Sequence, residues 1–321
     1  MIVTVTLNPL LERRYSFNSI IYPGVNRNGK VILSAGGKGI NISRQLNHFN
    51  TPNLAYTFLG GSNGKQFRSI LKDENINYTA VNIKSETREG VVIIDNENQK
   101  LTSLFGTNPD IAEQEVDEFK EKLEKIIQNC EIVVFSGSSP CSHTSSIIPF
   151  GIETANKFDK VSVCDTYGSH LFDCIKAGPT ILHNNIDEIS NSLNLKLDSE
   201  TDILSFMDLL YSNGIKQSYI TNEQHAFYAS NFDFHFRVDP PGIKNFSSTG
   251  SGDSFIAGII YGWHKDLTFE ESLKLGTSLG ALNASRAEVC NVSLQESEEF
   301  IPRVAFETIG KKMKILDVTP R

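Results

Sequence analysis

The stretch Phe246-Ser-Ser-Thr-Gly-Ser-Gly-Asp-Ser-Phe-Ile-Ala-Gly258 is a small, glycine-rich turn that runs into an apolar helical pattern. Gly250, Ser251 and Gly252 accept tight backbone angles, and they would present a row of backbone N–H groups at the start of a helix that begins near Asp253. The start of a helix attracts negative charge. We therefore expect an anion to bind at residues 250–253.

Asp253 is the only acid in this stretch, and it lies where a negative ligand would meet the helix. A carboxylate beside a bound anion is unfavourable unless it has a chemical task, and one such task is to take a proton from a hydroxyl that attacks phosphorus. An aspartate that only caps the helix is the structural alternative. Both interpretations stay open on this stretch alone.

Composition narrows the class of protein. The chain has 321 residues, of which 39% are hydrophobic, enough for one large α/β domain or two modest ones. A net charge of -8 argues against nucleic acid or an anionic membrane as partner. The apolar start, Met1–Leu7, is too short for a signal or membrane segment, so we expect a buried strand there. The cysteines lack disulfide or zinc spacing, which favours reduced thiols in a cytoplasmic protein: Cys130, Cys141, Cys164, Cys174 and Cys290.

Short β-type runs alternate with longer amphipathic runs, a pattern typical of a mostly parallel sheet flanked by helices. The expected strands are Ile2–Leu7, Leu54–Leu59, Ile132–Phe135, Val161–Asp165, Thr180–Leu182 and Gln217–Thr221. The expected helices are Ile40–Phe49, Lys65–Glu74, Glu113–Gln128, Thr144–Lys157, Glu200–Ser212 and the one after Gly252. We expect one domain spanning residues 1–321.

Two excursions break this rhythm, at about residues 12–35 and 82–108. They contain alternating stretches such as Val91–Asp95 and Lys100–Leu104, without helical periodicity. We expect them to pair into a small second sheet, a lid over the carboxyl ends of the core strands, where α/β proteins bind ligands. One face of this sheet has little to cover it, which favours a homodimer through the lid. A lid that folds onto its own core is the alternative.

Several short motifs follow one another along the chain, most of them at strand ends or in the lid excursions. They are Thr6-Leu-Asn-Pro9, Val25-Asn-Arg27, Gly36-Gly-Lys-Gly39, Glu86-Thr-Arg88, Asn185-Ile-Asp-Glu188, Thr249-Gly-Ser-Gly-Asp253 and Leu275-Gly-Thr-Ser-Leu-Gly-Ala-Leu-Asn-Ala284. In this order they resemble the ribokinase-like (PfkB) family of carbohydrate kinases, and more closely its branch of 1-phosphofructokinases and tagatose-6-phosphate kinases. The resemblance implies a three-layer α/β/α core with a mostly parallel sheet and a small β-sheet lid, usually in a dimer.

The resemblance also implies a reaction, the phosphorylation of a small-molecule sugar phosphate by ATP with Mg²⁺. Asp253 would be the general base toward the sugar hydroxyl. The N–H groups of Gly250, Ser251 and Gly252 would hold the transferring phosphoryl group.

Substrate residues follow from the same resemblance. Lys38, Arg88 and Arg27 would form the positive pocket for the phosphate already on the substrate. Asn41 and the backbone of Gly37 would bind sugar hydroxyls. Arg27 as a solvated lid charge is the structural alternative.

Nucleotide and metal residues are also implied. Asn185 and Glu188 would organise Mg²⁺ near the ATP phosphates, since Mg²⁺ prefers oxygen ligands; a helix cap with an acid three residues on is the structural alternative. Thr221 and Asn283 would lie on the nucleotide side, with Gly250 and Gly252. The family often holds K⁺ near the turn at residue 250, so we expect K⁺ as a further ion.

The chain also departs from the family pattern. Glu12 stands where the branch has Asp, so the acid that would grip sugar hydroxyls is one methylene longer. His183 and Asn184 replace a Lys and a Pro, and residues 221–226 lack the glycines of the adenine-side motif. Two functions follow: a kinase, with fructose 1-phosphate as first substrate and tagatose 6-phosphate or fructose 6-phosphate next, or a sugar-phosphate-binding regulatory protein that has drifted from catalysis. The intact Asp253 favours the kinase.

Overall fold

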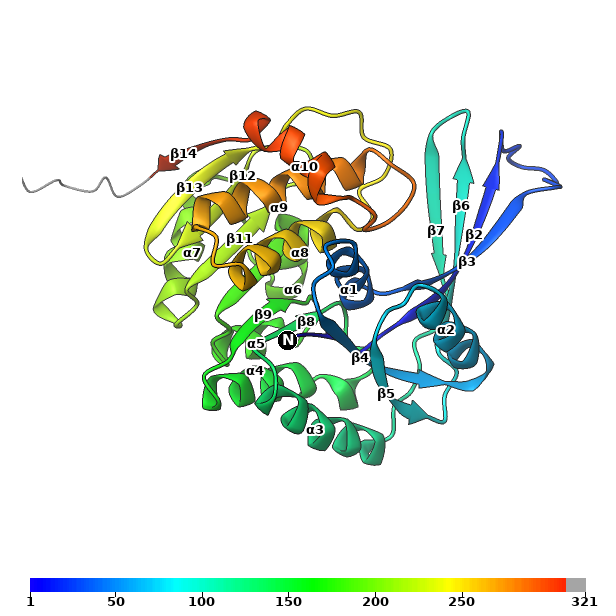
Figure 1. The fold of residues 1–321 in the computed structure, drawn as a ribbon, viewed down its shortest axis with the longest axis horizontal. Coiled ribbons are helices and arrows are strands. Elements are labelled where there is room, and N and C mark those ends of the chain that lie inside the picture. Colours follow the sequence, from blue (N-terminus) through cyan, green and yellow to red (C-terminus); the bar gives the residue numbers. More distant parts are fainter. Residues whose placement is uncertain (310–321) are drawn as a thin grey trace, which may run out of the picture.

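The computed structural model describes residues 1–309, in which one large sheet, one small sheet and two layers of helices are packed together (Figure 1). The large sheet contains, in spatial order, β14 (Ala305–Ile309), β13 (Phe234–Asp239), β12 (Phe227–Asn231), β11 (Gln217–Thr221), β10 (Ile181–Asn185), β9 (Val161–Asp165), β8 (Ile132–Ser136), β1 (Ile2–Thr6), β4 (Asn53–Gly60) and β5 (Tyr78–Ile83). The strands from β11 to β5 pair in parallel, whereas β12, β13 and β14 extend one edge in antiparallel order.

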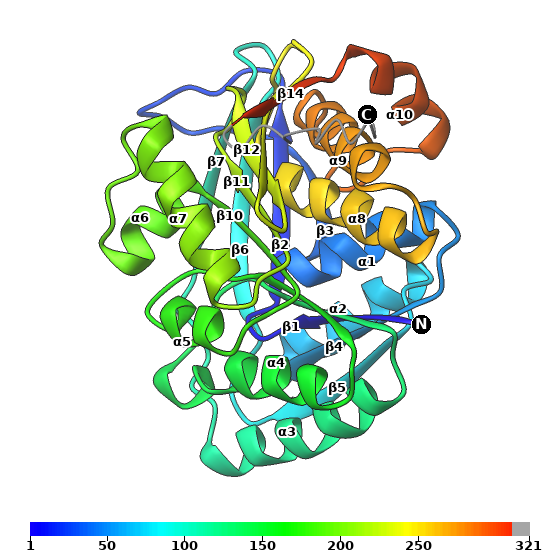
Figure 2. The same cartoon turned by 90° about the vertical axis from the view of Figure 1, so that its left-hand side faces the viewer.

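Helices cover both faces of this sheet, as Figure 2 shows. One face carries α1 (Lys38–His48), α2 (Gly61–Asp73), α8 (Ser251–His264), α9 (Phe269–Ala284) and α10 (Leu294–Phe300). The other face carries α3 (Glu113–Gln128), α4 (Ile147–Lys157), α5 (Leu171–Lys176), α6 (Ile186–Leu193) and α7 (Glu200–Ser212). Two short 3₁₀ turns, Ser142–Thr144 and Ile301–Arg303, complete the set.

The alternation of β1 explains why both faces need cover. Val3 and Val5 join the hydrophobic core beneath α3 and α4, while Ile2 joins the core beneath α1, α8 and α9. All five residues of β1 are buried, including Thr4, whose hydroxyl meets Ser43 of α1 at 2.7 Å. A strand that is buried on both faces is typical of a parallel sheet between two helical layers.

The small sheet has four strands in the order β3 (Lys30–Gly36), β2 (Leu10–Phe17), β6 (Arg88–Asp95) and β7 (Lys100–Phe105). Its central pair, β2 and β6, is parallel, and the outer pairs are antiparallel. Residues 7–9 connect β1 to β2, and Gly37 connects β3 to α1. This sheet, which we call the lid, stands at the right of Figure 1 and rises from the end of the core.

The predicted three-layer α/β/α core with a small additional sheet is confirmed. All six predicted strands and all six predicted helices are present, with bounds that differ by a few residues. Helix α2 starts at Gly61 rather than Lys65, and the predicted helix at Thr144 starts at Ile147 after a 3₁₀ turn. The antiparallel strands β12 to β14 were not predicted, and β5 pairs with β4 of the core.

The five cysteines are free thiols, and four of them are buried, as the sequence predicts. Within residues 1–309, no helix combines the length and the apolar composition needed to cross a membrane.

Helices α8 and α9 approach each other closely where Gly258 faces Gly276. A Cβ added at Gly258 would lie 2.7 Å from the Gly276 Cα and 2.9 Å from its N, both of them backbone atoms. Backbone cannot move aside as a flexible side chain can, so this pair of glycines fixes how α8 lies on α9.

We predict that Gly258→Ala destabilises the protein by about 1–3 kcal/mol through overpacking, although alanine favours a helix by about 1 kcal/mol over glycine. The measurement is chemical denaturation. Gly242→Ala is the control, because a Cβ there meets nothing within 4 Å. Equal stability of the two variants would contradict the close approach of α8 and α9.

Candidate active site

A left-handed residue introduces α8 at the carboxyl edge of the large sheet. Gly250 has φ 79° and is the N-cap, so α8 begins at Ser251, two residues before the expected position. The Ser251 N–H donates to the Ser248 carbonyl oxygen at 3.1 Å. Within residues 1–309, the N–H groups of Gly250, Gly252 and Asp253 have no partner. The free donors of the turn are therefore these three, ready to receive an anion.

Asp253 lies in the first turn of α8, and its side chain is only 4% exposed. Its Oδ2 accepts a hydrogen bond from the Asn41 amide at 2.7 Å. Burial raises the pKa of Asp253 to about 7; Asp165 adds to the rise, and Lys38 and Asn41 oppose it. A carboxyl group that titrates near neutrality is suited to take a proton from an alcohol.

Asn283 of α9 stabilises the turn at residue 250 by hydrogen bonds. Its side chain is fully buried, donates to the Thr249 carbonyl oxygen at 2.8 Å and accepts from the Cys290 N–H at 2.7 Å. A Cβ at Gly250 would collide with Val289 of the same loop. The polar atoms of Asn283 thus all face protein, and this predicted nucleotide residue holds the shape of the turn.

A charged cluster lies beside Asp253, at the ends of β8, β9 and β10. Lys38 Nζ donates to Asp165 Oδ1 at 3.2 Å and to Glu188 Oε1 at 2.8 Å. Asp165 is fully buried and also accepts from His183 Nδ1 at 2.9 Å and Ser136 Oγ at 2.5 Å. His183 therefore has a partner that the sequence did not suggest. Lys38 is thus bonded to two carboxylates of this cluster, and its contact with the phosphate of the substrate stays a prediction.

Interactions within the cluster keep Asp165 and Lys38 charged. Burial alone would raise the pKa of Asp165, but Lys38 and the hydrogen bonds from His183 and Ser136 lower it to about 2. Burial likewise disfavours the charge on Lys38, yet the carboxylates of Asp165, Glu188 and Asp253 raise the pKa of Lys38 above that of an ordinary lysine. Lys38 and Asp165 are therefore an ion pair at neutral pH.

Asn185 and Glu188 form the capping box that was the structural alternative. Asn185 Oδ1 accepts from the Glu188 N–H at 2.7 Å, and Glu188 Oε2 accepts from the Asn185 N–H at 3.1 Å. The neighbouring Asn184 is fully buried, and within residues 1–309 its Oδ1 has no partner. This oxygen and the Glu188 carboxylate are donors of the kind that Mg²⁺ prefers. They fit the ion, whereas Asn185 Oδ1 is already used by the cap.

The lid contributes an arginine with an unused donor. Arg88 Nη1 donates to Asn108 Oδ1 at 3.2 Å and Nη2 to the Asn8 carbonyl oxygen at 3.4 Å, while Nε is buried and has no partner in the described part of the chain. Asn8, at the end of β1, is 4% exposed, and its Oδ1 is also unpaired. Unsatisfied buried polar atoms are costly, which makes Arg88 Nε and Asn8 Oδ1 candidate contacts for a ligand.

A cavity of about 1060 Å³ runs from the lid strands along α1 to residues 50–52 and 74–77, and its lining does not include Lys38, Arg88 or Asp253. Strands β2 and β3 line one side, with Glu12 and Arg14, and α1 and residues 287–291 line the other, with Asn41. Glu12 fills the space left by Gly36 and lies 3.5 Å from Arg14. Burial raises the pKa of Glu12, although the nearby arginines oppose it.

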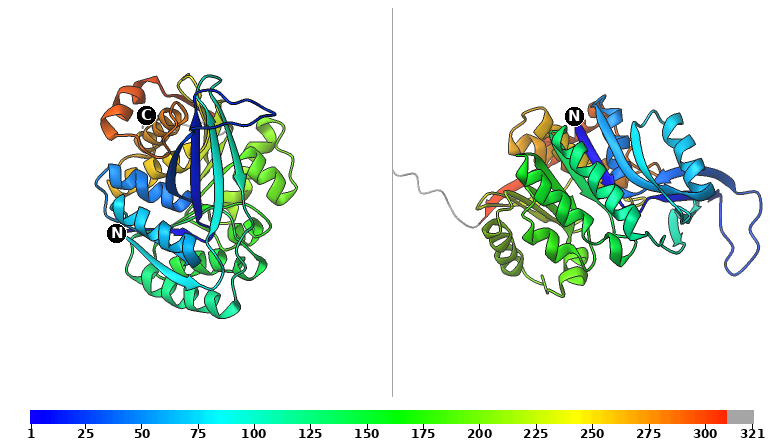
Figure 3. Two further views of the ribbon diagram at one scale, coloured as in Figure 1. Left: turned by 90° about the vertical axis from the view of Figure 1, so that its right-hand side faces the viewer. Right: turned by 90° about the horizontal axis from the view of Figure 1, so that it is seen from below.

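The structure thus brings most of the predicted residues to one edge of the sheet. Thr221 ends β11, with Oγ1 3.3 Å from His183 Nε2, and Gly37 caps α1 with φ 121°. Arg27 is the exception, because it is exposed in the loop between β2 and β3. Figure 3 shows this loop projecting away from the core.

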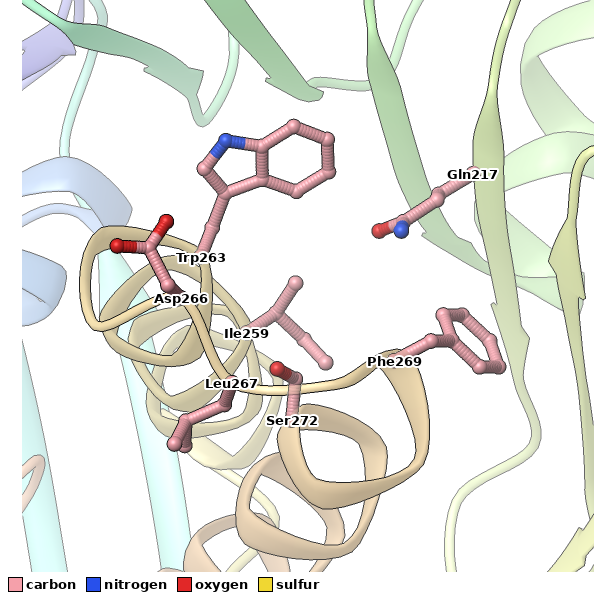
Figure 4. Close-up of a pocket in the computed structure, with 7 residues that line it drawn as sticks. All are labelled: Gln217, Ile259, Trp263, Asp266, Leu267, Phe269 and Ser272. Atoms are coloured by element: carbon pink, nitrogen blue, oxygen red, sulfur yellow. The ribbon is translucent and has the colours of Figure 1, made fainter.

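A smaller cavity of about 350 Å³ lies elsewhere, where α8 ends and α9 begins. Figure 4 shows Trp263 and Phe269 beside it, with Gln217 opposite. Gln217 opens β11, whose other end carries Thr221. This cavity therefore lies at the opposite end of the strands from Asp253.

Sequence reasoning missed two residues of the site. Asp165 was noted only as the end of a strand, and Asn8 only as part of a motif. The importance of the Asp165 carboxylate follows from its bonds to Lys38 and His183, which are distant from it in sequence. The available signal was position, because Asp165 ends β9 and Asn8 follows the end of β1, and ligands of α/β proteins bind at the carboxyl ends of strands.

Comparison with known proteins gives relatives over the whole chain. A 1-phosphofructokinase of Borreliella burgdorferi is 30% identical over 96% of this chain and 99% of its own length. A tagatose-6-phosphate kinase of Staphylococcus epidermidis is 29% identical over 95% of this chain and 98% of its own length.

Solved structures share the fold. A protein of Thermotoga maritima described as a possible 1-phosphofructokinase matches with a TM-score of 0.89 at 23% identity, over 96% of this chain and 99% of its own. Escherichia coli phosphofructokinase-2 in complex with potassium matches with a TM-score of 0.86 at 22% identity, over 94% of this chain and 98% of its own. At these identities the likeness concerns the fold alone.

An α/β/α core whose sheet edge holds a buried aspartate at an anion-binding helix start, beneath a β lid, defines a ribokinase-like sugar kinase. The model of the pfkB family carbohydrate kinases matches residues 4–296. The chain belongs to this family, and it is an enzyme that phosphorylates a carbohydrate.

We predict that Asp253→Asn stabilises the protein at pH 8. Because the pKa of Asp253 is raised from 3.8 to about 7 on folding, the folded protein holds the proton more tightly, and this stability is lost as pH rises through that window. Asparagine does not titrate, so the variant escapes the loss, which is about 1.4 kcal/mol for each pKa unit.

The measurement is thermal unfolding from pH 4 to pH 8, with Asp187→Asn as control because that carboxyl is exposed. The difference between Asp253→Asn and wild type should be small at pH 4 and grow toward pH 8. A difference that is constant with pH would show that Asp253 is not buried as a weak acid.

Proposed function

We propose that the protein transfers the γ-phosphoryl group of ATP to a ketohexose phosphate, with fructose 1-phosphate as its substrate and fructose 1,6-bisphosphate as its product. The observation that carries this proposal is the unpaired, buried Nε of Arg88 at the lid base. A neutral sugar gives this cation nothing to neutralise, whereas a phosphate accepts from the arginine fork. The similarity to a 1-phosphofructokinase over nearly the whole chain supports the same substrate.

In this proposal Asp253 is the general base. Its carboxylate removes the proton from the attacking sugar hydroxyl as the oxygen bonds to phosphorus. The N–H groups of Gly250, Gly252 and Asp253 stabilise the charge on the transferring phosphoryl group, because they are fixed in the protein before the reaction. Lys38 adds positive charge from the side of Glu188.

Mg²⁺ is the proposed metal, and Glu188 and Asn184 would hold it together with its waters. When bound, the ion neutralises charge on the ATP phosphates. K⁺ near residue 250 is a further proposal, supported by the potassium complex of the E. coli structure.

Tagatose 6-phosphate is the second candidate substrate, with fructose 6-phosphate after it. The similarity to a tagatose-6-phosphate kinase supports this alternative. So does Glu12, whose longer side chain reaches the cavity from β2 and would meet the sugar hydroxyls differently from an aspartate.

The test is ADP release from Mg-ATP with fructose 1-phosphate, fructose 6-phosphate, tagatose 6-phosphate, fructose and ribose, with and without K⁺. We expect turnover on one sugar phosphate and a loss of about 10²–10⁴-fold in Asp253→Asn. Arg88→Met should raise KM for that sugar phosphate by roughly 10–100-fold, the loss of a hydrogen bond to a charged group, and leave KM for ATP unchanged.

Arg68→Met is the matched control, since Arg68 is a surface arginine that bonds Asn82. Turnover of free fructose or ribose in preference to any phosphate would refute the sugar-phosphate proposal. Unchanged KM in Arg88→Met would refute the phosphate pocket alone.

We also propose a cytoplasmic homodimer that forms through the lid. The supporting observation is a group of exposed apolar side chains on its strands and its β2–β3 loop, with exposures of 94% for Tyr22, 74% for Val25, 66% for Ile21, 61% for Phe105 and 55% for Leu104. Exposed apolar patches on a single protein mark interaction surfaces. Two copies meeting there would also place Arg27 against a second chain.

We predict that Leu104→Asp shifts the protein from dimer to monomer in sedimentation velocity, because a charge in an apolar interface is costly. Leu209→Asp on α7 is the matched control, since Leu209 is 53% exposed and lies away from the lid. A monomeric wild type, or equal effects of the two substitutions, would exclude the lid interface.

A further inference from the structure

Arg44 lies on α1, one turn after Asn41, and its side chain is only 13% exposed. All three parts of its guanidinium are used. Nη1 donates to Asn41 Oδ1 at 2.8 Å, Nη2 to the Ala35 carbonyl oxygen at 2.6 Å and Nε to Glu74 Oε2 at 2.9 Å. These partners belong to α1, to the end of β3 and to the end of α2, so the fork is fixed by three elements.

The bond from Arg44 to Asn41 sets the direction of the Asn41 amide. Asn41 carries an acceptor at one end and donors at the other. Arg44 can only donate, so it requires Oδ1, and this turns Nδ2 toward Asp253 Oδ2 at 2.7 Å. A chain of hydrogen bonds therefore runs from Glu74 through Arg44 and Asn41 to Asp253.

This direction matters because Asp253 titrates near neutrality. An ionised carboxylate can only accept, whereas a protonated one can donate through its hydroxyl. Without Arg44, Asn41 could turn its Oδ1 toward Asp253 and stabilise the protonated acid, which cannot serve as a base. With Arg44 in place, Asn41 donates, and this favours the ionised form.

We propose that Arg44 is a positioning residue for the kinase reaction, which through Asn41 orients the Asp253 carboxylate and keeps it in its proton-accepting form. The proposal rests on the proposed role of Asp253 as the base. The proposal assigns a role to the Arg44 guanidinium, which contacts neither the turn at residue 250 nor the charged cluster around Lys38.

Other charged groups face the same residues. Asp253 interacts electrostatically with Lys38 of α1, Asp165 of β9, His183 of β10 and the Cys290 thiol of the loop after α9. Arg44 meets Glu74, and it also acts on Glu12 of β2 and His48 of α1. The test must therefore separate the bond through Asn41 from the charge of Arg44.

The experiment measures kcat and KM across pH for wild type, Arg44→Met, Arg44→Lys, Asn41→Ala and the double variant Arg44→Met with Asn41→Ala, together with Asp253→Asn. Arg68→Met is the control arginine. Arg44→Lys keeps the charge but lacks the fork, and it also serves if Arg44→Met folds poorly.

We expect Arg44→Met to lower kcat by roughly 10–100-fold, the scale for a misplaced catalytic group, with KM for ATP unchanged. The acid limb of its pH profile should move to higher pH, because the pKa of Asp253 rises when the Asn41 donor is lost. Arg44→Lys should resemble Arg44→Met. The double variant should be no slower than Asn41→Ala, because Arg44 acts through Asn41.

Two results would overturn the proposal. In the first, Arg44→Met keeps a near-normal kcat and an unshifted acid limb and only melts at a lower temperature. Arg44 would then stabilise the fold without positioning Asp253. The other is a double variant whose loss is the product of the single losses. An active Asp253→Asn would instead refute the base itself, so the two failures are distinguishable.

Discussion

Two buried carboxylates, Asp165 and Asp253, lie near one partly buried ammonium, Lys38, and the site depends on how its positive charge is shared. Lys38 is bonded directly to Asp165, which also accepts hydrogen bonds from His183 and Ser136. The pKa of Asp165 therefore falls to about 2. Among the described residues, Asp253 accepts one side-chain hydrogen bond, from the Asn41 amide, and burial raises its pKa to about 7. Environments that push two acids apart in this way assign them different roles. Asp165 is a fixed charge, and Asp253 is the acid that can exchange a proton.

The turn at residue 250 and the lid are connected through one loop, residues 285–291. Val289 and Cys290 pack against Gly250, and the Cys290 N–H is held by Asn283. The same loop accepts a hydrogen bond at the Ala287 carbonyl oxygen from Arg14 of the lid, at 2.7 Å. One short segment, residues 285–291, therefore contacts both the lid and the turn that forms the anion site. Closure over a sugar can in this way be coupled to the geometry that receives the phosphoryl group.

Local patterns predicted the parts of the structure that local forces determine. The apolar runs gave the core strands, and the glycine-rich stretch gave the helix start with Asp253. The capping box at Asn185 was also visible, because its partners lie within one turn. Other bonds join different segments of the chain, and no local sequence pattern predicts them. Examples are the bonds of Lys38 to Asp165 and of Arg44 to Ala35 and Glu74. The antiparallel strands β12 to β14 were missed for a related reason, since they extend a sheet whose parallel part alone follows the βα rhythm.

The lid is assembled from two excursions that leave the core at different points of the chain. Its central pair, β2 and β6, is parallel, and α1, β4, α2 and β5 lie between them in sequence. Pairing across so long a segment carries an entropic cost until the intervening elements are in place. We therefore expect the lid to be the last sheet to form during folding and the first to open in the native state. Sub-global opening of such a unit leaves the hydrophobic cores intact, so the lid can detach from the core while the rest of the enzyme stays folded.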